Sequence, residues 1–590
     1  MAAAELTRRM GARTAAVLLM ASQATAHVAE DAVAIATLAW QPTEIVLHAR
    51  QDHPWEEFPV VGKFVHDASG DELTVEAFWD GGRRWVIRFA PPRVGPWRYE
   101  TRSDDPGLDG RRGLIHAAEP SADQVRSNPN LRGRVEIAAD GRTFQYADGE
   151  PLLLMGDTLW AGNSARCGLG DDRDGPFYEY LADRKSKGFN AVLMRYINGF
   201  GDEQHNPLGH RNEGGRLFED GGQDRINPDY FRSLDQRVAA LADYGFVAVV
   251  PISWWGKTRV CPIEFDLATQ LSAYCAVRYA AYNTIWALSG EYQYAFQDCG
   301  WTPEQFDQLG ATLQQHNAYR RPTSIHPSSR TDFDPPHNGQ SSRAYHRSPW
   351  LDHHWLQTGQ RVSSLRNIPL RAAEVRDLSP VRPVFCSEGF YESADDQDGA
   401  YHARWQVWQA VLAGCAGYGY GAHGVWQFFD PHDPDGETGK PVAGSVPWRQ
   451  ALQLPGASQV RHALTLLSDL PWPETTPCTE RLRVDGAPVA RPTSSDLSPP
   501  VAAAMGTDDY VLYLPRGNGA ADIELMAHHS DGAYHAEWFD PRTADRITCG
   551  QVVVDRGRLR VPSRPTPGDE DWVLWLRAAD DTQLPVGIDR

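Results

Sequence analysis

Between residues 35 and 120 apolar and polar positions alternate along the chain, as they do in half-buried β-strands. The clearest case is the segment 73–91, where alternating runs stand on both sides of the turn Asp80-Gly81-Gly82 and predict a hairpin. Shorter strand-like runs with turn residues between them fill the rest of this part of the chain. The pattern predicts an N-terminal Ig-like β-sandwich over residues 35–120.

Between residues 130 and 472 short apolar runs alternate with segments of helical periodicity. Residues 176–188 predict a helix that has Pro176 at its first position and Gly188 as its stop. Residues 228–245 predict a second helix in the same way. Eight apolar runs can be counted as strands in this part of the chain. Strands that are each followed by a helix favour a (β/α)8 TIM barrel over an open doubly wound sheet.

From residue 475 to residue 580 short strand patterns return, separated by turns, and predict a C-terminal β-domain. The predicted fold class is therefore α/β, with a (β/α)8 TIM barrel flanked by an N-terminal β-sandwich and a C-terminal β-sandwich domain. We expect both flanking domains to act as packing or polymer-positioning modules and to hold no catalytic residue.

Composition and charge narrow the range of partners. The 590 residues carry a formal net charge of −20 with 23% charged residues, which leaves little attraction for phosphate backbones or anionic membranes. We therefore expect no nucleic-acid partner. Beyond the N-terminus the sequence has no run of roughly 18 uninterrupted apolar residues, so we expect no membrane span.

The first 26 residues have the order of a secretory signal peptide. The basic stretch RRMGART is followed by the apolar AAVLLMA and by the small-residue site ATA, which ends at Ala26. This order predicts a secreted or periplasmic protein; the alternative, in which the segment is not a signal, is a cytoplasmic one. The eight Cys lie far apart without the spacing of a zinc site, and they imply no particular disulfide.

Two carboxylates follow predicted barrel strands. Glu291 ends the stretch NTIWALSGE, residues 283–291, and Glu388 comes directly after the apolar run in PVFCSEGFY, residues 383–391. By our count these are the fourth and seventh barrel strands, and the active sites of such barrels lie where the strands end. A pair of carboxylates among aromatic side chains suits glycoside hydrolysis, because one protonates the leaving oxygen while the other attacks or activates water. We predict that Glu291 and Glu388 are catalytic.

Other strand ends carry polar and aromatic side chains that could bind a sugar, since aromatic faces stack on its C–H surfaces. The predicted substrate-binding residues are Asp157, Trp160, Arg195, Trp254, His326, His354, Gln357, Tyr391, His423 and Trp426. Among them Asp157 is expected to bind a hydroxyl group or an ion-pair partner and not to catalyse. Glu392, one residue after Tyr391, is the nearest rival of Glu388 and is expected to support the site from a loop.

Two motifs could suggest a cofactor, and both are weak. The stretch GYGYGAHG has glycines in the order of a dinucleotide-binding loop, but the strand-like VWQFF follows it instead of a helix. The stretch Asp352-His353-His354 lacks partners at the spacing of metal ligands. We therefore expect neither a metal ion nor an organic cofactor.

Several stretches of the chain resemble one family. FQYADGEPLLLMGDTLW, KGFNAVLMR, WALSGEY, VFCSEGFYES and GAHGVWQ are similar to segments of the apiosidase-like glycoside hydrolases. The resemblance implies a barrel with the acid/base on strand four and the nucleophile on strand seven, which would be Glu291 and Glu388. The flanks resemble the β-sandwich often found ahead of such barrels and the collagen-binding-like β-domain often found behind them. In one departure, Ser289 and Gly290 precede Glu291 where many members of the wider clan have Asn before the acid, which puts the usual Asn contact to the sugar 2-hydroxyl in doubt.

Together these observations lead us to expect a glycoside hydrolase with a carbohydrate substrate. The resemblance favours a retaining enzyme that is exo-acting on a terminal furanose or unusual sugar of a plant or microbial polysaccharide or oligosaccharide. The alternative is a catalytically silent carbohydrate-binding or matrix-adhesion protein, in which the barrel is a scaffold between two β-modules.

Overall fold

The computed structural model describes residues 33–198, 210–219, 222–257, 261–330, 340–432, 444–517, 519, 521–566 and 569–579. The predicted signal segment, residues 1–26, lies outside these ranges. The chain divides into two compact units, one up to Pro120 and the other from Ser121 onward.

The N-terminal unit consists of a five-stranded and a three-stranded sheet. In sheet order these are β1 (Val33–Leu38), β8 (Arg112–Ala118), β7 (Gly95–Ser103), β3 (Val60–His66) and β4 (Glu72–Glu76), then β2 (Thr43–His48), β6 (Arg84–Phe89) and β5 (Phe78–Trp79). Large aromatic side chains are buried in this unit, among them Trp85, Trp97 and the stacked pair Phe64 and Phe89, whose rings lie 3.9 Å apart.

The predicted hairpin forms only close to its turn. Phe78 and Trp79 pair with Val86 and Trp85, as the turn at Asp80-Gly81-Gly82 requires. The preceding residues 72–76 do not continue that ladder, because they pair with β3 in the other sheet. Alternation alone could not reveal that one continuous apolar pattern is divided between two sheets.

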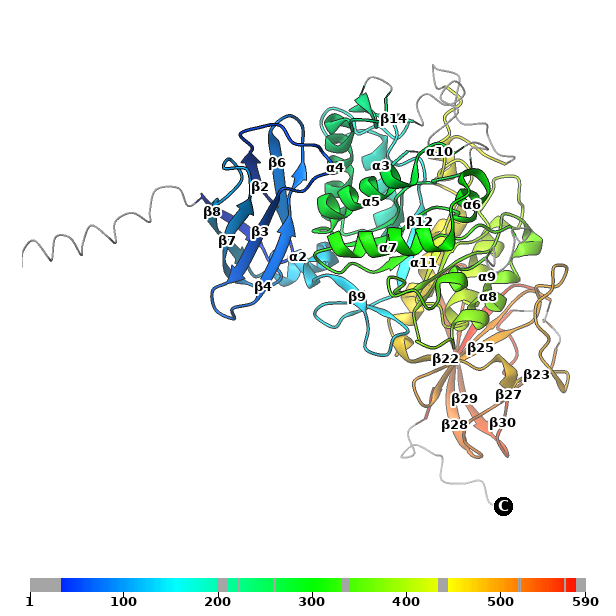
Figure 1. The fold of residues 1–590 in the computed structure, drawn as a ribbon. Coiled ribbons are helices and arrows are strands. Elements are labelled where there is room, and N and C mark those ends of the chain that lie inside the picture. Colours follow the sequence, from blue (N-terminus) through cyan, green and yellow to red (C-terminus); the bar gives the residue numbers. More distant parts are fainter. Residues whose placement is uncertain are drawn as a thin grey trace, which may run out of the picture. The chain divides into compact units, whose positions relative to one another are not determined.

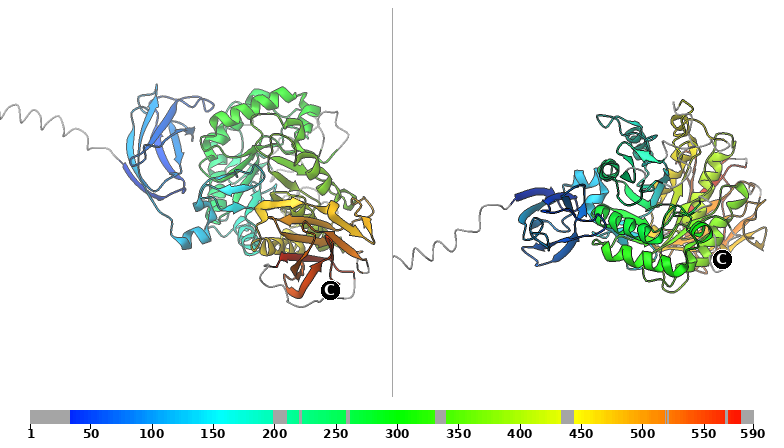
Figure 2. Two further views of the ribbon diagram at one scale, coloured as in Figure 1. Left: turned by 90° about the horizontal axis from the view of Figure 1, so that it is seen from below. Right: turned by 45° about the horizontal axis from the view of Figure 1, so that its top comes forward.

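Eight parallel strands of the second unit form a nearly closed barrel (Figures 1 and 2). In chain order they are β12 (Leu154–Thr158), β13 (Ala191–Leu193), β16 (Val247–Pro251), β17 (Thr284–Ala287), β18 (Thr323–Ser324), β19 (His354–Gln357), β20 (Val384–Glu388) and β21 (Gly417–Tyr420). Apart from β18 and β19, which are the two edge strands, neighbours along the chain are neighbours in the sheet, and β12 pairs with β21. The edge strands β18 and β19 are connected by a hydrogen bond of 2.8 Å from the Asp352 N–H, just before β19, to the Thr323 carbonyl of β18. The predicted TIM barrel with flanking β-regions is confirmed.

Helices follow most of the barrel strands. They are α3 (Pro176–Ser186), α4 (Pro228–Asp243), α5 (Phe265–Tyr279), α6 (Gln293–Cys299), α7 (Pro303–His316), α8 (Asn367–Val375), α9 (Gly399–Leu412), α10 (Trp448–Ala451) and α11 (Pro455–Leu467). The two helices predicted in detail begin as expected, with Pro at the first position of α3 and of α4. The side chain of Asn227 caps α4 by accepting a hydrogen bond from the Asp229 N–H at 3.0 Å.

Smaller elements complete the barrel region. They are α2 (Ala122–Ser127), a three-stranded sheet of β9 (Val135–Ile137), β10 (Phe144–Tyr146) and β11 (Pro151–Leu152), the pair β14 (Arg211–Asn212) and β15 (Gly215–Arg216), and the 3₁₀ turns Pro129–Arg132, Ser342–Tyr345, Val362–Ser364, Trp472–Glu474 and Thr479–Arg481. Val135 and Phe144 belong to the same buried cluster as the barrel strands, so the small sheet extends the barrel core.

The C-terminal part has a six-stranded and a four-stranded antiparallel sheet. In sheet order the strands are β22 (Thr475–Pro477), β25 (Val501–Met505), β26 (Asp509–Leu514), β31 (Trp572–Ala578), β28 (Gly532–Phe539) and β29 (Arg546–Val554), then β24 (Ala487–Pro488), β23 (Leu482–Val484), β27 (Ile523–Met526) and β30 (Arg558–Arg560).

The barrel helix α9 packs against this C-terminal part. Trp408 of α9 is stacked on Tyr513 with ring centroids 6.3 Å apart. Arg404 of the same helix forms a buried, two-pronged ion pair with Asp571 at 2.7 and 2.9 Å. Because a buried charge pair and aromatic packing cross the junction, the barrel and the C-terminal sheets form one compact unit.

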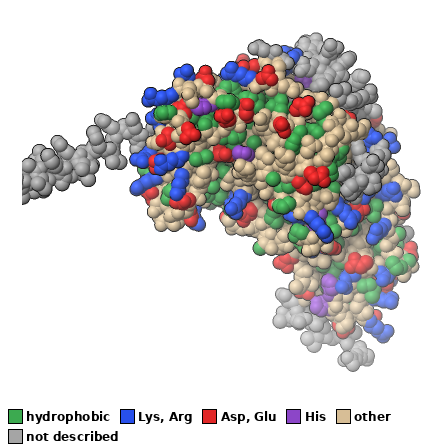
Figure 3. Space-filling view, viewed as in Figure 1, with side chains coloured by type: hydrophobic (Ala, Val, Ile, Leu, Met, Phe, Trp, Pro, Cys, Tyr) green, Lys and Arg blue, Asp and Glu red, His purple; other side chains and the backbone are tan. Residues whose placement is uncertain are grey.

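None of the helices in the described part of the chain has the length and apolar character that crossing a bilayer would require. Acidic and basic side chains are interspersed on the face drawn in Figure 3. One disulfide, Cys261–Cys299, joins the loop after β16 to the end of α6, although the spacing of the cysteines had implied no pairing.

Candidate active site

A cavity of about 820 Å³ lies at the carboxyl ends of the barrel strands. Glu291, four residues beyond β17, and Glu388, the last residue of β20, both line it. They stand at the carboxyl ends of the fourth and seventh barrel strands in chain order, and each residue is only 6% exposed. The two carboxyl groups also share a neighbour, because the Gln357 amide contacts Glu291 Oε1 at 3.5 Å and bonds Glu388.

Glu388 is held by hydrogen-bond donors on several sides. His326 Nε2 lies 3.0 Å from Oε2, and Gln360 Nε2 donates to Oε1 at 3.1 Å. Tyr391 also bonds this carboxyl group. Burial alone raises the pKa of Glu388, but the hydrogen bond and charge of His326, followed by the Gln357 amide, hold it below its usual value. Since an ionised carboxylate only accepts, His326 carries a proton on Nε2 and donates it.

Glu291 has a different set of neighbours. Its Oε2 forms an ion pair with Lys257 Nζ and accepts a hydrogen bond from Trp254 Nε1 at 3.2 Å. Ser328 Oγ approaches Oε1 at 3.4 Å. The backbone of Glu291 has φ 41°, in the left-handed region that side chains other than Gly rarely adopt. Such strain concentrates at functional sites, where the surroundings fix the conformation.

Packing explains the Ser289-Gly290 pair that lies between β17 and Glu291. A Cβ on Gly290 would lie 2.3 Å from the Trp254 ring, so only glycine lets this indole pack against the backbone. Ser289 is fully buried, and its hydroxyl lies 3.1 Å from the Gly290 carbonyl oxygen. Ser289 is not among the residues that line the cavity, so it does not replace the Asn of the wider clan as a sugar contact.

Seven of the residues predicted to bind substrate line this cavity together with the two glutamates. They are Trp160, Arg195, Trp254, Gln357, Tyr391, His423 and Trp426. Trp160 and Trp254 meet edge to face with centroids 5.0 Å apart, and Trp160 Nε1 donates to Tyr391 OH at 2.9 Å. Burial lowers the pKa of Arg195 to about 10, and its guanidinium lies 6.0 Å from the Trp254 ring centroid. The cavity wall is therefore aromatic with a few polar groups, as in many sugar sites.

Three of the predicted contacts lie elsewhere. Asp157 is fully buried and accepts hydrogen bonds from Arg184 Nε at 2.7 Å and Tyr180 OH at 2.8 Å, so it ties β12 to α3. His354 is buried in a separate histidine network. His326 is fully buried and is not part of the cavity lining, but it bonds Glu388 and packs against the rings of Trp160 and Trp254. The listing of strand ends could not show on which side of a strand each side chain lies, and a substrate contact is wrong for Asp157 and His354.

The rival carboxylate also lies outside the cavity lining. Glu392 Oε1 accepts a hydrogen bond from the Gly456 N–H at 3.0 Å, and its Oε2 accepts one from Tyr420 OH at 2.5 Å. Sequence reasoning missed Lys257 and Gln360, which line the cavity three residues beyond strand-end motifs that had been singled out. Nearness to those motifs was the signal that could have found them.

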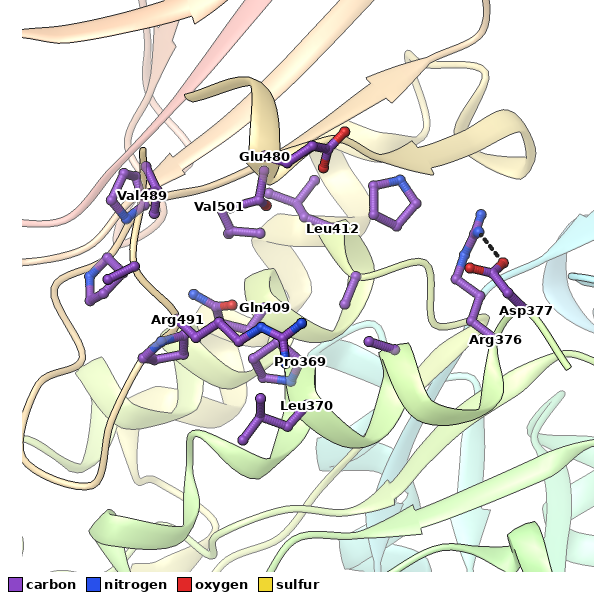
Figure 4. Close-up of a pocket in the computed structure, with 18 residues that line it drawn as sticks. Pro369, Leu370, Arg376, Asp377, Gln409, Leu412, Glu480, Val489, Arg491 and Val501 are labelled. Carbon is purple, nitrogen blue, oxygen red and sulfur yellow. Dashed lines mark hydrogen bonds and ion pairs between the residues drawn. The ribbon is translucent and has the colours of Figure 1, made fainter. Parts of the chain in front are cut away.

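A second cavity, of about 350 Å³, lies between α8, α9 and the C-terminal sheets (Figure 4). Proline and aliphatic side chains make up much of its wall, among them Pro369, Leu370 and Val501. Asp377, one of its carboxylates, is ion-paired with Arg376 at 3.2 Å. This cavity is away from the strand ends and lacks a facing pair of carboxylates in its lining, so it is no second candidate for the chemistry.

No group of three or more His, Cys, Asp or Glu among the described residues could hold a metal ion. His354 of β19 instead forms a hydrogen-bonded network with His346, in which the position of each proton is fixed. His346 Nε2 donates to the Ser379 carbonyl at 2.8 Å, so its Nδ1 accepts from His354 Nε2 at 3.1 Å. Burial lowers the pKa of His354, and that of its fully buried neighbour His353, to about 3.

This burial predicts acid sensitivity. The unfolded chain protonates His353 and His354 below their ordinary pKa of 6.5, whereas the folded protein keeps both neutral down to about pH 3. Stability is therefore present above pH 6.5 and is lost on acidification, by up to about 1.4 kcal/mol per pH unit for each histidine. Urea unfolding between pH 7 and 4.5 measures this slope.

The matched variants are His354→Gln and His529→Gln, since His529 is an exposed histidine beside Asp508. His354→Gln should reduce the slope of the free energy of unfolding against pH by about the contribution of one histidine. His529→Gln should leave this slope unchanged. A His354→Gln protein with the slope of the wild type would contradict this account of the network.

Comparison with known proteins identifies the barrel. The model of the family "Apiosidase-like, catalytic domain" matches residues 138–474, and that of a domain of unknown function, DUF5060, matches residues 37–104. A comparison with curated proteins finds no match.

Solved structures agree on the fold. A proposed glycoside hydrolase from Bacteroides vulgatus ATCC 8482 is 19% identical, with 92% of this chain and 100% of that chain covered and a TM-score of 0.62. A glycoside hydrolase family 5 protein from the same organism is also 19% identical, with 78% and 96% covered and a TM-score of 0.60. Because the family model spans more than half of the sequence, the chain belongs to the apiosidase-like family and is a glycosidase.

Proposed function

We propose that the protein is a retaining, exo-acting glycosidase that releases a terminal furanose or another unusual sugar from a plant or microbial polysaccharide or oligosaccharide. In this proposal Glu388 is the nucleophile and Glu291 the acid/base. The observation that carries it is the pairing of the two carboxylates in one aromatic-walled cavity, where both contact the Gln357 amide. The family membership of the chain supports the furanose.

The different surroundings of the two carboxylates support the roles. Glu388 is kept ionised by His326 and by amide donors, as a nucleophile requires. Glu291 has Oε1 approached only at 3.4 and 3.5 Å, so this oxygen can carry a proton towards the cavity. Two carboxyl groups that share one amide neighbour lie close together, which suits a retaining separation of about 5 to 5.5 Å better than the wider spacing of inverting enzymes.

The reaction then has two steps. A Glu388 oxygen forms a bond to the anomeric carbon while the bond to the leaving oxygen breaks, and Glu291 gives that oxygen its proton. Glu291, now a carboxylate, takes a proton from water, whose oxygen attacks the anomeric carbon and releases Glu388. The tryptophans of the wall would stack on the sugar and exclude bulk water in both steps.

A screen of 4-nitrophenyl furanosides and pyranosides tests the proposed activity directly. We expect release of nitrophenol from at least one furanoside by the wild type. Failure to cleave any of the panel, or cleavage confined to pyranosides, would contradict the proposed sugar class. Cleavage of polysaccharide only at internal bonds would contradict exo action.

The acid/base role of Glu291 predicts a specific rescue. Glu291→Ala should keep the first step with a good leaving group such as nitrophenol, because that group needs little protonation, but should lose about 10²- to 10⁴-fold with a poor one. Azide should restore turnover of the nitrophenyl substrate and yield a glycosyl azide, since azide attacks without a general base. Equal losses with both leaving groups and no effect of azide would contradict the role.

A further inference from the structure

Lys257 lies in the loop after β16 and forms an ion pair with Glu291 Oε2. Trp254, from the same loop, donates its indole N–H to that oxygen at 3.2 Å. The neighbours of the other oxygen, Ser328 Oγ and Gln357 Nε2, are farther away, at 3.4 and 3.5 Å. One oxygen of the carboxyl group thus receives a cation and an N–H donor, which leaves Oε1 as the oxygen that carries the proton.

Both members of this ion pair have left-handed backbone conformations. Lys257 has φ 73° and Glu291 has φ 41°. Such a conformation is unfavourable for a residue with a Cβ and persists only where the surroundings fix it. Two strained residues therefore meet at one contact, at the edge of the cavity that both of them line.

The loop of Lys257 is fastened to the segment that carries Glu291. The fastening contacts are a hydrogen bond of 2.8 Å from Trp255 Nε1 to the Leu288 carbonyl, the approach of Gly256 to the Tyr294 backbone, where a Cβ would lie 2.5 Å away, and the Cys261–Cys299 disulfide. These contacts come from the backbone and the cross-link, so the placement of the ammonium group beside Glu291 is built into the fold and does not depend on a flexible side chain alone.

We propose that Lys257 is a positioning residue for the acid/base: its ammonium group stabilises the carboxylate that Glu291 becomes when it gives its proton to the leaving oxygen. This inference rests on the proposed function. The proton passes from Glu291 to the leaving oxygen, the glycosidic bond breaks and Glu388 bonds to the anomeric carbon, while Lys257 keeps its own protons. The ammonium group interacts more strongly with the ionised Glu291 than with the protonated one. It therefore lowers the barrier of the step in which Glu291 gives up its proton.

Lys257 is a cation throughout. Burial lowers the pKa of Lys257, but the charge and hydrogen bond of Glu291 outweigh burial and hold this pKa above its usual value. Near this ion pair, His326 bonds Glu388, and the Tyr294 ring lies beside both Lys257 and Arg330. The other charged or titratable residues that line the cavity are Arg195, His210, Glu388, Tyr391, Asp395, Asp396 and His423. Among the described residues Lys257 is the one cation in contact with the Glu291 carboxyl group.

The ion pair links Lys257 to the pH range of the enzyme. An opposite charge next to a carboxyl group favours its ionised form and commonly lowers its pKa by about 1 to 3 units. The Lys257 side chain is half exposed, so water screens part of its charge. Loss of the charge should therefore let Glu291 keep its proton to higher pH.

The test compares the pH dependence of kcat/KM for Lys257→Met, Lys257→Arg and the wild type, with a glycoside of poor leaving group chosen from the screen. In Lys257→Met the alkaline limb should move up by about one pH unit, while the rate on the acidic side falls about tenfold because the new carboxylate loses its cation. Lys257→Arg should keep the limb of the wild type. Lys63→Met is the matched control, since Lys63 is also 51% exposed and ion-paired, with Glu72 in the N-terminal unit.

A role in folding alone would lower the rate of Lys257→Met by the same factor at every pH and leave the limb in place, which would overturn the proposal. A second measurement does not need turnover. In protein with ¹³C-labelled glutamate carboxyl groups, the Glu291 signal is assigned by its absence from Glu291→Gln, and it should change with protonation at a higher pH in Lys257→Met. If no glycoside is cleaved, the proposed function fails, but this titration still decides about Lys257, and an unchanged titration overturns the inference.

Discussion

Glu388→Ala should lower kcat on the furanoside found in the screen by about 10⁴-fold or more, because the covalent route needs a nucleophile and Ala cannot supply one. The substitution removes the acceptor of His326 and Gln360, both of which hold the carboxylate in place. Steady-state kinetics with purified protein measure the loss. Unchanged binding of the furanoside to the variant would show that the cavity persists.

The matched control is Glu392→Gln. Glu392 follows Glu388 by four residues but is engaged by Tyr420 and the Gly456 N–H outside the cavity lining. We expect Glu392→Gln to keep kcat within a few-fold of the wild type while its thermal stability falls, because a buried carboxylate loses bonds. Near-normal turnover in Glu388→Ala together with loss in Glu392→Gln would reverse the assignment.

Asp571→Ala should lower the free energy of unfolding of the larger unit by about 3 to 5 kcal/mol, because it leaves the Arg404 guanidinium buried without its charge partner. Asp571 is fully buried, and Arg404 is 3% exposed. Tyr513 OH also donates to Asp571 at 3.1 Å and would lose its acceptor. Urea unfolding followed by tryptophan fluorescence measures the change.

Asp522→Ala is the control for this result. Asp522 forms an ion pair with Arg560 in the same C-terminal part, but both side chains are exposed, so the expected change is below about 1 kcal/mol. The double variant Arg404→Met/Asp571→Leu should regain much of the lost stability, because it leaves no buried charge unpaired. If Asp571→Ala unfolds like the wild type, the C-terminal sheets are an independent module after all.

The contact between α9 and the C-terminal sheets indicates that the C-terminal β-domain cannot be removed without harm to the barrel. Helix α9 is buried along nearly its whole length, with Trp408 against Tyr513. We therefore expect a chain that ends near residue 475 to lose the folded barrel, since the removal exposes this helix. The sequence of α9 mixes apolar residues with His402, Arg404, Gln406 and Gln409, so it could not show which element covers the helix.

The barrel itself could be predicted because its signals are local. Pro176 and Asn227 mark helix starts, and the strands are continuous apolar runs, as in sheets that are buried on both faces. The limits of the N-terminal hairpin could not be predicted in the same way. Whether residues 72–76 pair with β3 or continue towards β6 depends on tertiary contacts that the local pattern does not contain.

For the candidate site, the order of strands brought Glu291 and Glu388 to one cavity as the count of strands suggested. Residues at the strand ends still divide between the inside and the outside of the barrel. Asp157 is on the side of α3, where Arg184 binds it, and the sequence gives no sign of that partner. Besides its nearness to Trp254, Lys257 had a further sign: it is one of only five Lys in a chain that otherwise uses Arg as its cation.

The most direct test of the proposed mechanism is the anomeric configuration of the first product, read by ¹H NMR within minutes of adding enzyme to the cleaved aryl furanoside and before mutarotation. Double displacement through Glu388 inverts the anomeric carbon twice, so the released sugar should have the configuration of the substrate. A first product of the opposite configuration would contradict the account, because it would require a single attack by water between two more widely separated carboxylates.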